Sequence, residues 1–301
     1  MRLVFLGTPA AAVPSLRALV AAGHDVALVV SRADARRGRR GELAPSPVKA
    51  AAAELGIPCT DRVAGAVGCG ADLGVVVAYG RLIKPDVLAA LPMLNVHFSL
   101  LPRWRGAAPV ERAVLAGDPT TGVCLMALEE TLDTGPVYRR TEVAIDPTET
   151  VEALRGRLAH LGARLLVDAL ADGLGEPQPQ HGEVTYAAKV TPDELELRWG
   201  RPAVDLARLT RLGRAHTTFR GRRLLVVHAD VADTAEAGGA DAGALGELRG
   251  APPGTLAGDL LATGRGALRL VRVQPEGRRA QPAAEWRNGA RPAPGEVLGR
   301  P

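Results

Sequence analysis

Residues 71–80 read ADLGVVVAYG, a stretch whose centre, LGVVVA, is uniformly apolar. A strand of this composition is buried on both faces, as in a parallel sheet covered by helices. Comparable runs lie at 2–7 (RLVFLG), 25–31 (DVALVVS), 94–99 (LNVHFS) and 121–130 (TGVCLMALEE). Helical stretches separate them, so the pattern predicts a doubly wound α/β domain with a mostly parallel, Rossmann-like sheet.

The second half of the chain has a different pattern. A helical stretch at 148–173 closes the first domain, and the Pro-, Gln- and Gly-rich residues that follow have the composition of a linker. Further on, RRLLVVHADV and ALRLVRVQP resemble strands, while the Ala/Gly-rich residues 232–254 between them are predicted to form a mobile loop. We therefore predict a domain at 1–174, a linker at 175–194 and a smaller domain rich in strands at 195–301.

Composition argues against several classes of protein. No apolar run approaches the roughly 20 residues that a transmembrane helix needs, and the run before Gly7 is too short for a signal peptide. The three cysteines form no CxxC pair and have no histidine at metal-ligand spacing, which argues against a disulfide scaffold or a metal centre. We expect a cytoplasmic protein without a metal or a membrane partner. The net charge of +4 is a weak signal, because arginines are abundant throughout the chain.

The stretch NVHFSLLPRWRGAAP, at 95–109, holds the first candidate site residues. Side chains alternate along a strand, so Asn95 and His97 point to the same side, and Pro102 cannot continue a central strand. Both residues then lie at the carboxyl end of a strand, where open α/β sheets bind ligands. An imidazole can transfer a proton, and an amide can donate to a developing oxyanion. A buried structural histidine beside a turn-forming asparagine explains the same pattern equally well.

The stretch LDTGPV, at 132–137, places Asp133 after another apolar strand. The D-T-G triplet also matches aspartic proteases, but that chemistry needs two carboxylates that share a proton. The chain has no second D-T-G, and its flanks are α/β, so we reject this reading unless the protein is an obligate dimer. An aspartate that caps a turn is a common alternative. A strand-end aspartate near His97 could instead orient the imidazole and stabilise its charge.

NVHFSLLPRWRGAAPV, with LDTGPV downstream and APSPVK upstream, resembles the methionyl-tRNA formyltransferase family, whose formyl donor is 10-formyltetrahydrofolate. The resemblance is dense over residues 1–145 and extends to about residue 200. It implies transfer of a formyl group to the α-amino group of methionyl initiator tRNA by a monomer. It also implies that Asn95, His97 and Asp133 are catalytic, and that the folate site is lined by Ser99, Leu100, Leu101 and Pro102.

The resemblance also implies contacts with tRNA. The loop at 31–49 corresponds to an insertion that reaches the acceptor arm in the family, and its arginines suit phosphate contacts. The implied tRNA-binding residues are Arg36, Arg37, Arg39, Arg40 and, in the YAAK context, Lys189. A solvated arginine loop and an ordinary surface lysine are the alternatives. Gly41 stands where the family has a basic residue.

The second domain of the family is a small OB-like β-barrel that contacts tRNA, a role that this fold often serves. Here the proline- and tryptophan-containing segment expected before FRG is mostly absent from 211–221. No strand is expected between PPGTLAG (252–258) and GALRL (266–270), where the family has one, which predicts a shortened barrel. Two alternatives therefore remain: a formyltransferase acting on an amino sugar or other small amine, and a degenerate paralogue that only binds folate or RNA.

Overall fold

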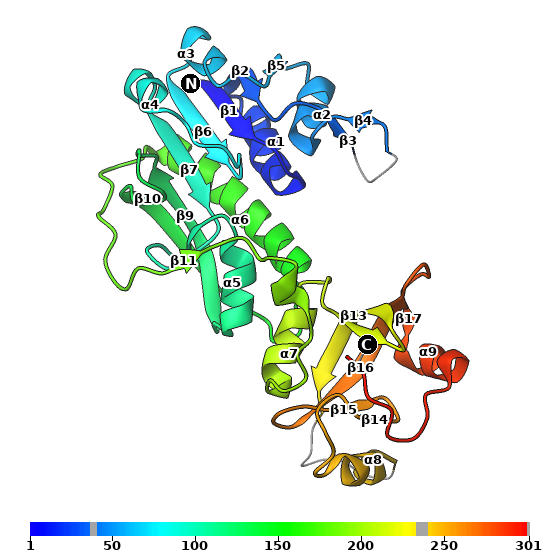
Figure 1. Cartoon of the computed structure of the whole chain (residues 1–301). Helices are drawn as coiled ribbons and strands as arrows, with labels where there is room; N and C mark the ends of the chain where they lie inside the picture. Colours follow the sequence, from blue (N-terminus) through cyan, green and yellow to red (C-terminus); the bar gives the residue numbers. More distant parts are fainter. Residues whose placement is uncertain (37–40, 233–239, 300–301) are drawn as a thin grey trace. The chain divides into compact units, whose positions relative to one another are not determined.

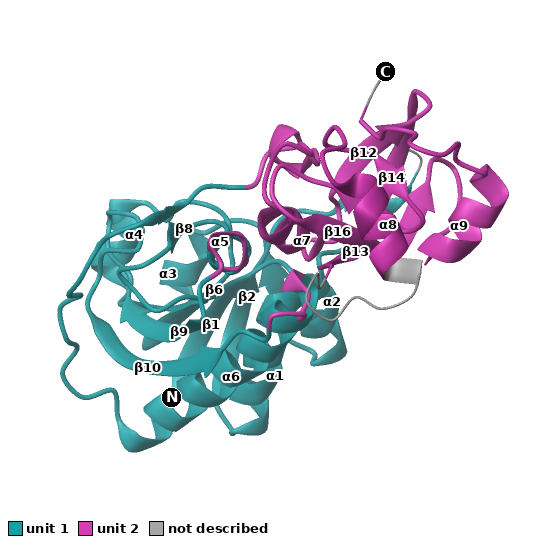
Figure 2. Cartoon of the chain, turned by 90° about the horizontal axis from the view of Figure 1, so that it is seen from below, with its two compact units in different colours: residues 1–113, 118–146, 152–189 teal, residues 114–117, 147–151, 190–301 magenta. Residues whose placement is uncertain are grey.

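The computed structural model describes residues 1–36, 41–232 and 240–299, which form two compact units (Figure 1). Unit 1 comprises residues 1–113, 118–146 and 152–189, and unit 2 comprises 114–117, 147–151 and the chain from 190 onward (Figure 2). No helix among the described residues combines the length and the apolarity needed to cross a membrane.

A seven-stranded sheet forms the centre of unit 1, in the order β10-β9-β7-β6-β1-β2-β5. The strands from β7 to β5 run parallel, and β9 and β10 are antiparallel to their neighbours. The mostly parallel sheet predicted from the apolar runs is confirmed. The bounds are β1 Arg2–Gly7, β2 Asp25–Val30, β5 Cys59–Thr60, β6 Leu73–Val77, β7 Met93–His97, β9 Thr120–Ala127 and β10 Val137–Ala144.

Strand β10 was not predicted from the sequence, because it lies at the edge of the sheet. Its residues alternate between exposed and partly buried, so it lacks the apolar run that marks β6. The chain moves from β1 toward β2 on one side and from β6 toward β7 on the other, so the order of connection reverses between β1 and β6. Ligands of open α/β sheets bind beside such a reversal, at the carboxyl ends of the strands.

Helices cover both faces of this sheet (Figure 1). Ser46 caps α2 by accepting a hydrogen bond from the Lys49 N–H at 3.0 Å, and Gly23 ends α1 with a φ of +81°. In α6, a Cβ at Gly162 would lie 2.7 Å from Val96, so only glycine allows this close approach to β7. The bounds are η1 Ala10–Ala12, α1 Val13–Ala21, α2 Pro47–Glu54, α3 Gly65–Gly68, α4 Pro85–Ala90, α5 Pro109–Ala116 and α6 Val151–Asp172.

Unit 1 also contains two small strand pairs. Strands β3 (Ala35–Arg36) and β4 (Leu43–Ala44) pair antiparallel in the arginine-rich loop. Strands β8 (Arg105–Gly106) and β11 (Tyr186–Ala187) pair in parallel. The predicted linker of 175–194 therefore belongs to unit 1 as far as Lys189, and its strand lies beside the turn that follows β7.

Unit 2 is built on a six-stranded antiparallel sheet in the order β12-β13-β16-β15-β14, with β17 paired to β16. Its core contains Trp199, Leu206, Val226, Leu268 and Trp286. The strands are β12 His216–Phe219, β13 Arg222–Val231, β14 Leu256–Ala257, β15 Leu260–Ala262, β16 Ala267–Pro275 and β17 Gln281–Pro282. The helices are η2 Asp193–Leu195, α7 Ala203–Thr210, α8 Ala240–Leu248 and α9 Ala283–Ala290.

The last described residues close this sheet into a small barrel. The N–H of Leu256 in β14 donates to the Glu296 carbonyl at 2.9 Å, and the N–H of Gly299 donates to the carbonyl of Thr218 in β12 at 2.8 Å. The segment 296–299 thus joins the two end strands, which confirms the predicted OB-like barrel.

Two sequence predictions for unit 2 are wrong. The strand expected to be missing between 252–258 and 266–270 is present as β15, so the barrel is not shortened at this point. The two-residue turn at Gly258–Asp259 and the three-residue strand after it are too short to produce a recognisable period. The predicted mobile loop contains α8, because alanine and leucine favour helix and Leu248 packs on Leu260 and Ala262. Residues 233–239 of that loop lie outside the described part of the chain.

Candidate active site

The site begins at the carboxyl end of β7, between β6 and β9 in the sheet. Asn95 and His97 point to one side and are only 8% and 6% exposed. Val96 and Phe98 point to the other side, where Gly162 lets α6 pack against them. The burial of both faces and the close packing of α6 hold this strand end in place. The same-face placement predicted from strand alternation is what the structure shows.

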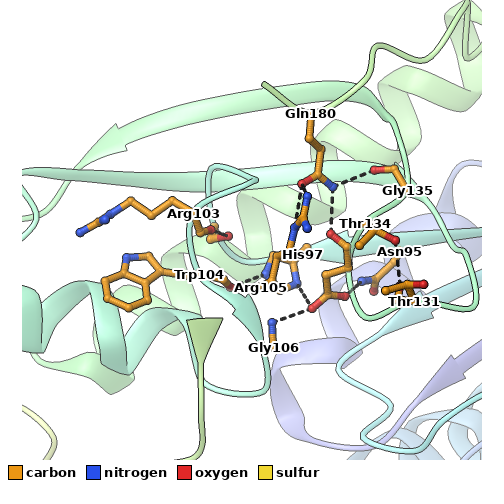
Figure 3. Close-up of polar contacts among 12 residues, drawn as sticks. Asn95, His97, Arg103, Trp104, Arg105, Gly106, Thr131, Thr134, Gly135 and Gln180 are labelled. Atoms are coloured by element: carbon orange, nitrogen blue, oxygen red, sulfur yellow. Dashed lines mark hydrogen bonds and ion pairs between the residues drawn. The ribbon is translucent and has the colours of Figure 1, made fainter. Parts of the chain in front are cut away.

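Asp133 reaches the same place from the loop between β9 and β10. The residue is 7% exposed. Its Oδ1 accepts a hydrogen bond from Asn95 Nδ2 at 3.4 Å (Figure 3). Its Oδ2 accepts a stronger one from the Gly106 N–H at 2.7 Å. Asp133 has a φ of +51°, in the left-handed region that aspartate tolerates better than most residues. The structure therefore brings the three predicted catalytic residues together.

His97 lies between two acceptors. Its Nε2 is 3.0 Å from the carbonyl oxygen of Trp104, and its Nδ1 is 3.7 Å from Asp133 Oδ2. A carbonyl oxygen can only accept, so Nε2 must carry a proton. This contact fixes the orientation of the ring and leaves Nδ1 on the side of Asp133.

The Trp104 carbonyl is held by a second polar network. The Trp104 indole N–H donates to Asp118 Oδ2 at 2.7 Å, and Arg103 pairs with the same carboxylate at 2.6 Å. The Arg103 guanidinium lies 4.5 Å from the centre of the Trp104 ring, a cation–π contact. The hydrogen bond to Asp118 raises the pKa of Arg103. The N–H of Trp104 donates to Thr185 Oγ1 at 2.9 Å, which ties the turn to the segment before β11.

The four residues implied to line the folate site form the turn after β7. Ser99 is fully buried, and its hydroxyl donates to the Arg103 carbonyl at 2.6 Å. Leu101 packs in a cluster with Cys124 and Met126, and Leu100 lies against Gly122. Pro102 is also buried. These contacts stabilise the turn, and contact with a folate stays a prediction.

The loop that carries Asp133 also borders a surface pocket of about 430 Å³. Glu129, Glu130 and Thr131 line it from the loop, and Pro85, Leu88 and Ala89 line it from α4. Gly135 holds the loop close to β9, because a Cβ there would lie 2.0 Å from the Ala127 carbonyl oxygen.

The residues implied to bind tRNA are only partly described. Arg36 is exposed on β3, and Lys189 is exposed at the end of unit 1. Arg37, Arg39 and Arg40 lie outside the described residues. In the part of the chain that the structure describes, no hydrogen bond or ion pair joins Arg36 or Lys189 to Asn95, His97 or Asp133. Within the described ranges, no group of three or more His, Cys, Asp or Glu residues is arranged to hold a metal ion.

Sequence reasoning missed several residues that complete the site. The Gly106 N–H, the Trp104 carbonyl and Asp118 act through backbone geometry or through a partner distant in sequence. Gln180 contacts the Asp133 loop from the predicted linker. The RWRG sequence at 103–106 predicted the end of the strand, but no sequence pattern identified Gln180 or Asp118 as part of the site.

The fold and the site define an α/β enzyme with a buried polar centre at the carboxyl end of its parallel strands. The formyl transferase family matches residues 1–170, and the formyl transferase C-terminal domain matches residues 189–291. The chain is 43% identical to the methionyl-tRNA formyltransferase of Jannaschia sp. (strain CCS1), over 99% of this chain and 100% of that protein. It is 45% identical to that of Dinoroseobacter shibae, over 96% of this chain and 97% of the relative.

Solved structures agree in fold. The methionyl-tRNA formyltransferase from Clostridium thermocellum has a TM-score of 0.56 at 15% identity, covering 78% of this chain and 95% of its own. HypX from Aquifex aeolicus, in complex with tetrahydrofolic acid, has a TM-score of 0.63 at 17% identity, covering 95% of this chain and 47% of its own. The chain belongs to the formyl transferase family, and the relatives that resemble it over their full length are methionyl-tRNA formyltransferases.

Proposed function

We propose that this protein transfers a formyl group from 10-formyltetrahydrofolate to the α-amino group of methionyl initiator tRNA. The observation that carries the proposal is the similarity to methionyl-tRNA formyltransferases over nearly the whole chain, with both units included. The buried group of Asn95, His97 and Asp133 supports it, because the residue types suit the reaction.

The folate supplies the formyl group as a co-substrate. Negative charge develops on the formyl oxygen as the amine attacks. The second N–H of the Asn95 amide can donate a hydrogen bond to this oxygen, and so can an N–H at His97 Nδ1, which lies 3.7 Å from Asp133 Oδ2 and is not committed to a hydrogen bond there. The Trp104 carbonyl holds the imidazole through Nε2, and Asp133 lies beside Nδ1. Donors aimed in advance at a developing oxyanion commonly lower the barrier by about 3 kcal/mol each.

Asp133 has a second role in this proposal. The attacking amine loses one proton as its bond to the formyl carbon forms, and Asp133 can accept that proton. It can then return the proton to the nitrogen that leaves, so the transfer takes up no net proton. The pairing of Oδ2 with the Gly106 N–H keeps the carboxylate in place during both steps.

The substrate contacts of the proposal come from the resemblance. Ser99 to Pro102 would line the folate site, and the pocket between α4 and residues 129–131 lies against the same catalytic loop. The exposed Arg36 and Lys189 would contact tRNA phosphates, together with the arginines at 37, 39 and 40. A monomer in the cytoplasm, where charged tRNA is used, completes the proposal.

The alternatives have less support. The degenerate-paralogue reading depended on a shortened second domain, and β15 and the closing segment 296–299 are both present. An enzyme that acts on an amino sugar would not require similarity to methionyl-tRNA formyltransferases throughout unit 2.

The test uses the purified chain with 10-formyltetrahydrofolate and three acceptors: methionyl initiator tRNA, free methionine and an amino-sugar nucleotide. We expect formylation of the charged tRNA far above that of either small molecule. Formylation of the sugar nucleotide without formylation of the tRNA would refute the proposed substrate. Failure to formylate any acceptor would refute the proposed reaction.

A further inference from the structure

Gln180 uses every polar group of its side chain beside the candidate catalytic loop. Its Nε2 donates to the backbone carbonyls of Asp133 at 2.9 Å and of Gly135 at 2.8 Å (Figure 3). Its Oε1 accepts from Arg105, at 3.1 Å from Nε and 2.7 Å from Nη2. A primary amide has two N–H groups, so both carbonyls can be satisfied at once.

These hydrogen bonds lie beside the residue of the loop that has an unfavourable backbone conformation. Asp133 has a φ of +51°, a conformation that costs free energy for a residue other than glycine. Among the described residues, Thr134 forms hydrogen bonds only to Thr131 and Glu129, on the preceding side of the loop. The Gln180 amide holds the carbonyls of the residues on both sides of Thr134. It thereby fixes the backbone conformation at Asp133 and the direction in which the Asp133 side chain projects.

The contacts form a closed ring through β8. Arg105 binds Gln180, and the next residue, Gly106, donates its N–H to Asp133 Oδ2 at 2.7 Å. The Asp133 carboxylate is therefore held directly by the Gly106 N–H. The Asp133 backbone is held by Gln180, which is in turn bound by Arg105. A shift of either end would change the distance between Oδ2 and His97 Nδ1, which is 3.7 Å.

The backbone around Gln180 is itself anchored. Gln178 and Val137 exchange two backbone hydrogen bonds of 2.8 Å each, and β11, which begins eight residues after Gln178, pairs with β8. Gln180 thus bridges a fixed segment and the loop, and it is only partly exposed.

We propose that Gln180 is a positioning residue, which sets the orientation of Asp133 toward His97 without contacting the substrate. The proposal rests on the proposed function, because it assigns a role to Asp133. A residue of this kind affects the chemical step more than binding. Misplacement of a reacting group by about 1 Å can cost about 100-fold in rate.

The experiment compares kcat and KM of wild type, Gln180→Ala, Gln180→Glu and Gln178→Ala with 10-formyltetrahydrofolate and methionyl-tRNA. Gln180→Ala should lower kcat about 10- to 100-fold and leave both KM values within about threefold. Gln180→Glu keeps the size of the side chain and the acceptor for Arg105. It loses the two donors and should not restore kcat. Gln178→Ala is the matched control and should behave as wild type, because among the described residues that side chain donates only to the Glu176 carbonyl, at 3.4 Å.

Thermal melts show which variants fold. If Gln180→Ala does not fold, Arg105→Lys is the second variant, because it removes the two-pronged contact with Oε1, and it should also lower kcat with KM unchanged. A kcat for folded Gln180→Ala within twofold of wild type would overturn the proposal, as would a change in KM alone or full activity of Gln180→Glu. A wild-type protein that does not formylate methionyl-tRNA would instead refute the proposed function.

Discussion

Replacing Asp133 by asparagine removes one negative charge from the site and keeps the shape of the side chain. The loop conformation should survive, because asparagine tolerates the φ of +51° at this position as well as aspartate does. The asparagine carbonyl can still accept the Gly106 N–H, which now lies 2.7 Å from Oδ2. Its amide then faces Asn95 and His97, where the carboxylate had been an acceptor and a counter-charge.

The size of the effect follows from the distance between the two charges. His97 Nδ1 and Asp133 Oδ2 are 3.7 Å apart, and a unit positive charge that forms on the ring during the reaction is attracted to the carboxylate by about 4.5 kcal/mol at an effective dielectric constant of about 20. We expect about 3 to 4 kcal/mol of this to be lost from the transition state. Each tenfold change in rate corresponds to about 1.4 kcal/mol, so kcat should fall roughly 100- to 1,000-fold.

The assay is the initial rate of formylation of methionyl-tRNA at saturating formyl donor, together with a thermal melt of the same preparation. Asp168→Asn is the matched control, since it removes the same charge from an exposed position on α6 and should leave kcat unchanged. A folded Asp133→Asn protein whose kcat lies within tenfold of wild type would refute the electrostatic role assigned to Asp133.

Three further perturbations test other parts of the molecule. Asn95→Ala should lower kcat by about 100-fold with little change in melting temperature, and near-normal turnover would contradict its donor role. Serine in place of the arginines at 36, 37, 39 and 40 should weaken tRNA binding and reduce the salt dependence of log K by about 0.9 per lost phosphate contact. An unchanged slope would exclude the loop from the interface.

The third perturbation is Glu296→Gln. The pKa of the Glu296 carboxyl is lowered chiefly by the hydrogen bond that it accepts from Arg220. That stabilisation is present above the pKa of the unfolded carboxyl and is lost as pH falls through the folded value. At neutral pH, Glu296→Gln should lower the melting temperature by roughly 2–5 °C, and this difference should shrink on acidification. An equal difference at all pH values would contradict the ion pair.

Local patterns were enough to predict much of the first unit. Apolar runs marked β1, β2, β6 and β7, because strands buried on both faces contain few polar residues. Strand β10 was missed, because an edge strand with one exposed face has no such run. In unit 2, β15 and α8 were missed because the first is very short and the second lies in an Ala/Gly-rich segment.

The candidate site was likewise predicted from local sequence in part, and the rest of it depends on the fold. Asn95 and His97 are two residues apart in one strand, so the two-residue period of a strand alone determined that they share a face. The position of Asp133 beside them depends on the antiparallel register of β9, on the close approach at Gly135 and on a left-handed backbone conformation. The resemblance named Asp133, but no local pattern could show that it reaches His97.

The amino-acid sequence by itself determined the fold class, the same-face pair at the end of β7 and, through three motifs in order, the family. Only the tertiary structure decided that the barrel closes through residues 296–299 and that the 175–189 segment belongs to the first unit. It also decided that Gln180 and Gly106 hold Asp133 in place. Strand and helix periods arise from neighbouring residues. These contacts join backbone and side-chain groups that are tens of residues apart, and only the packed chain brings such groups within hydrogen-bonding distance.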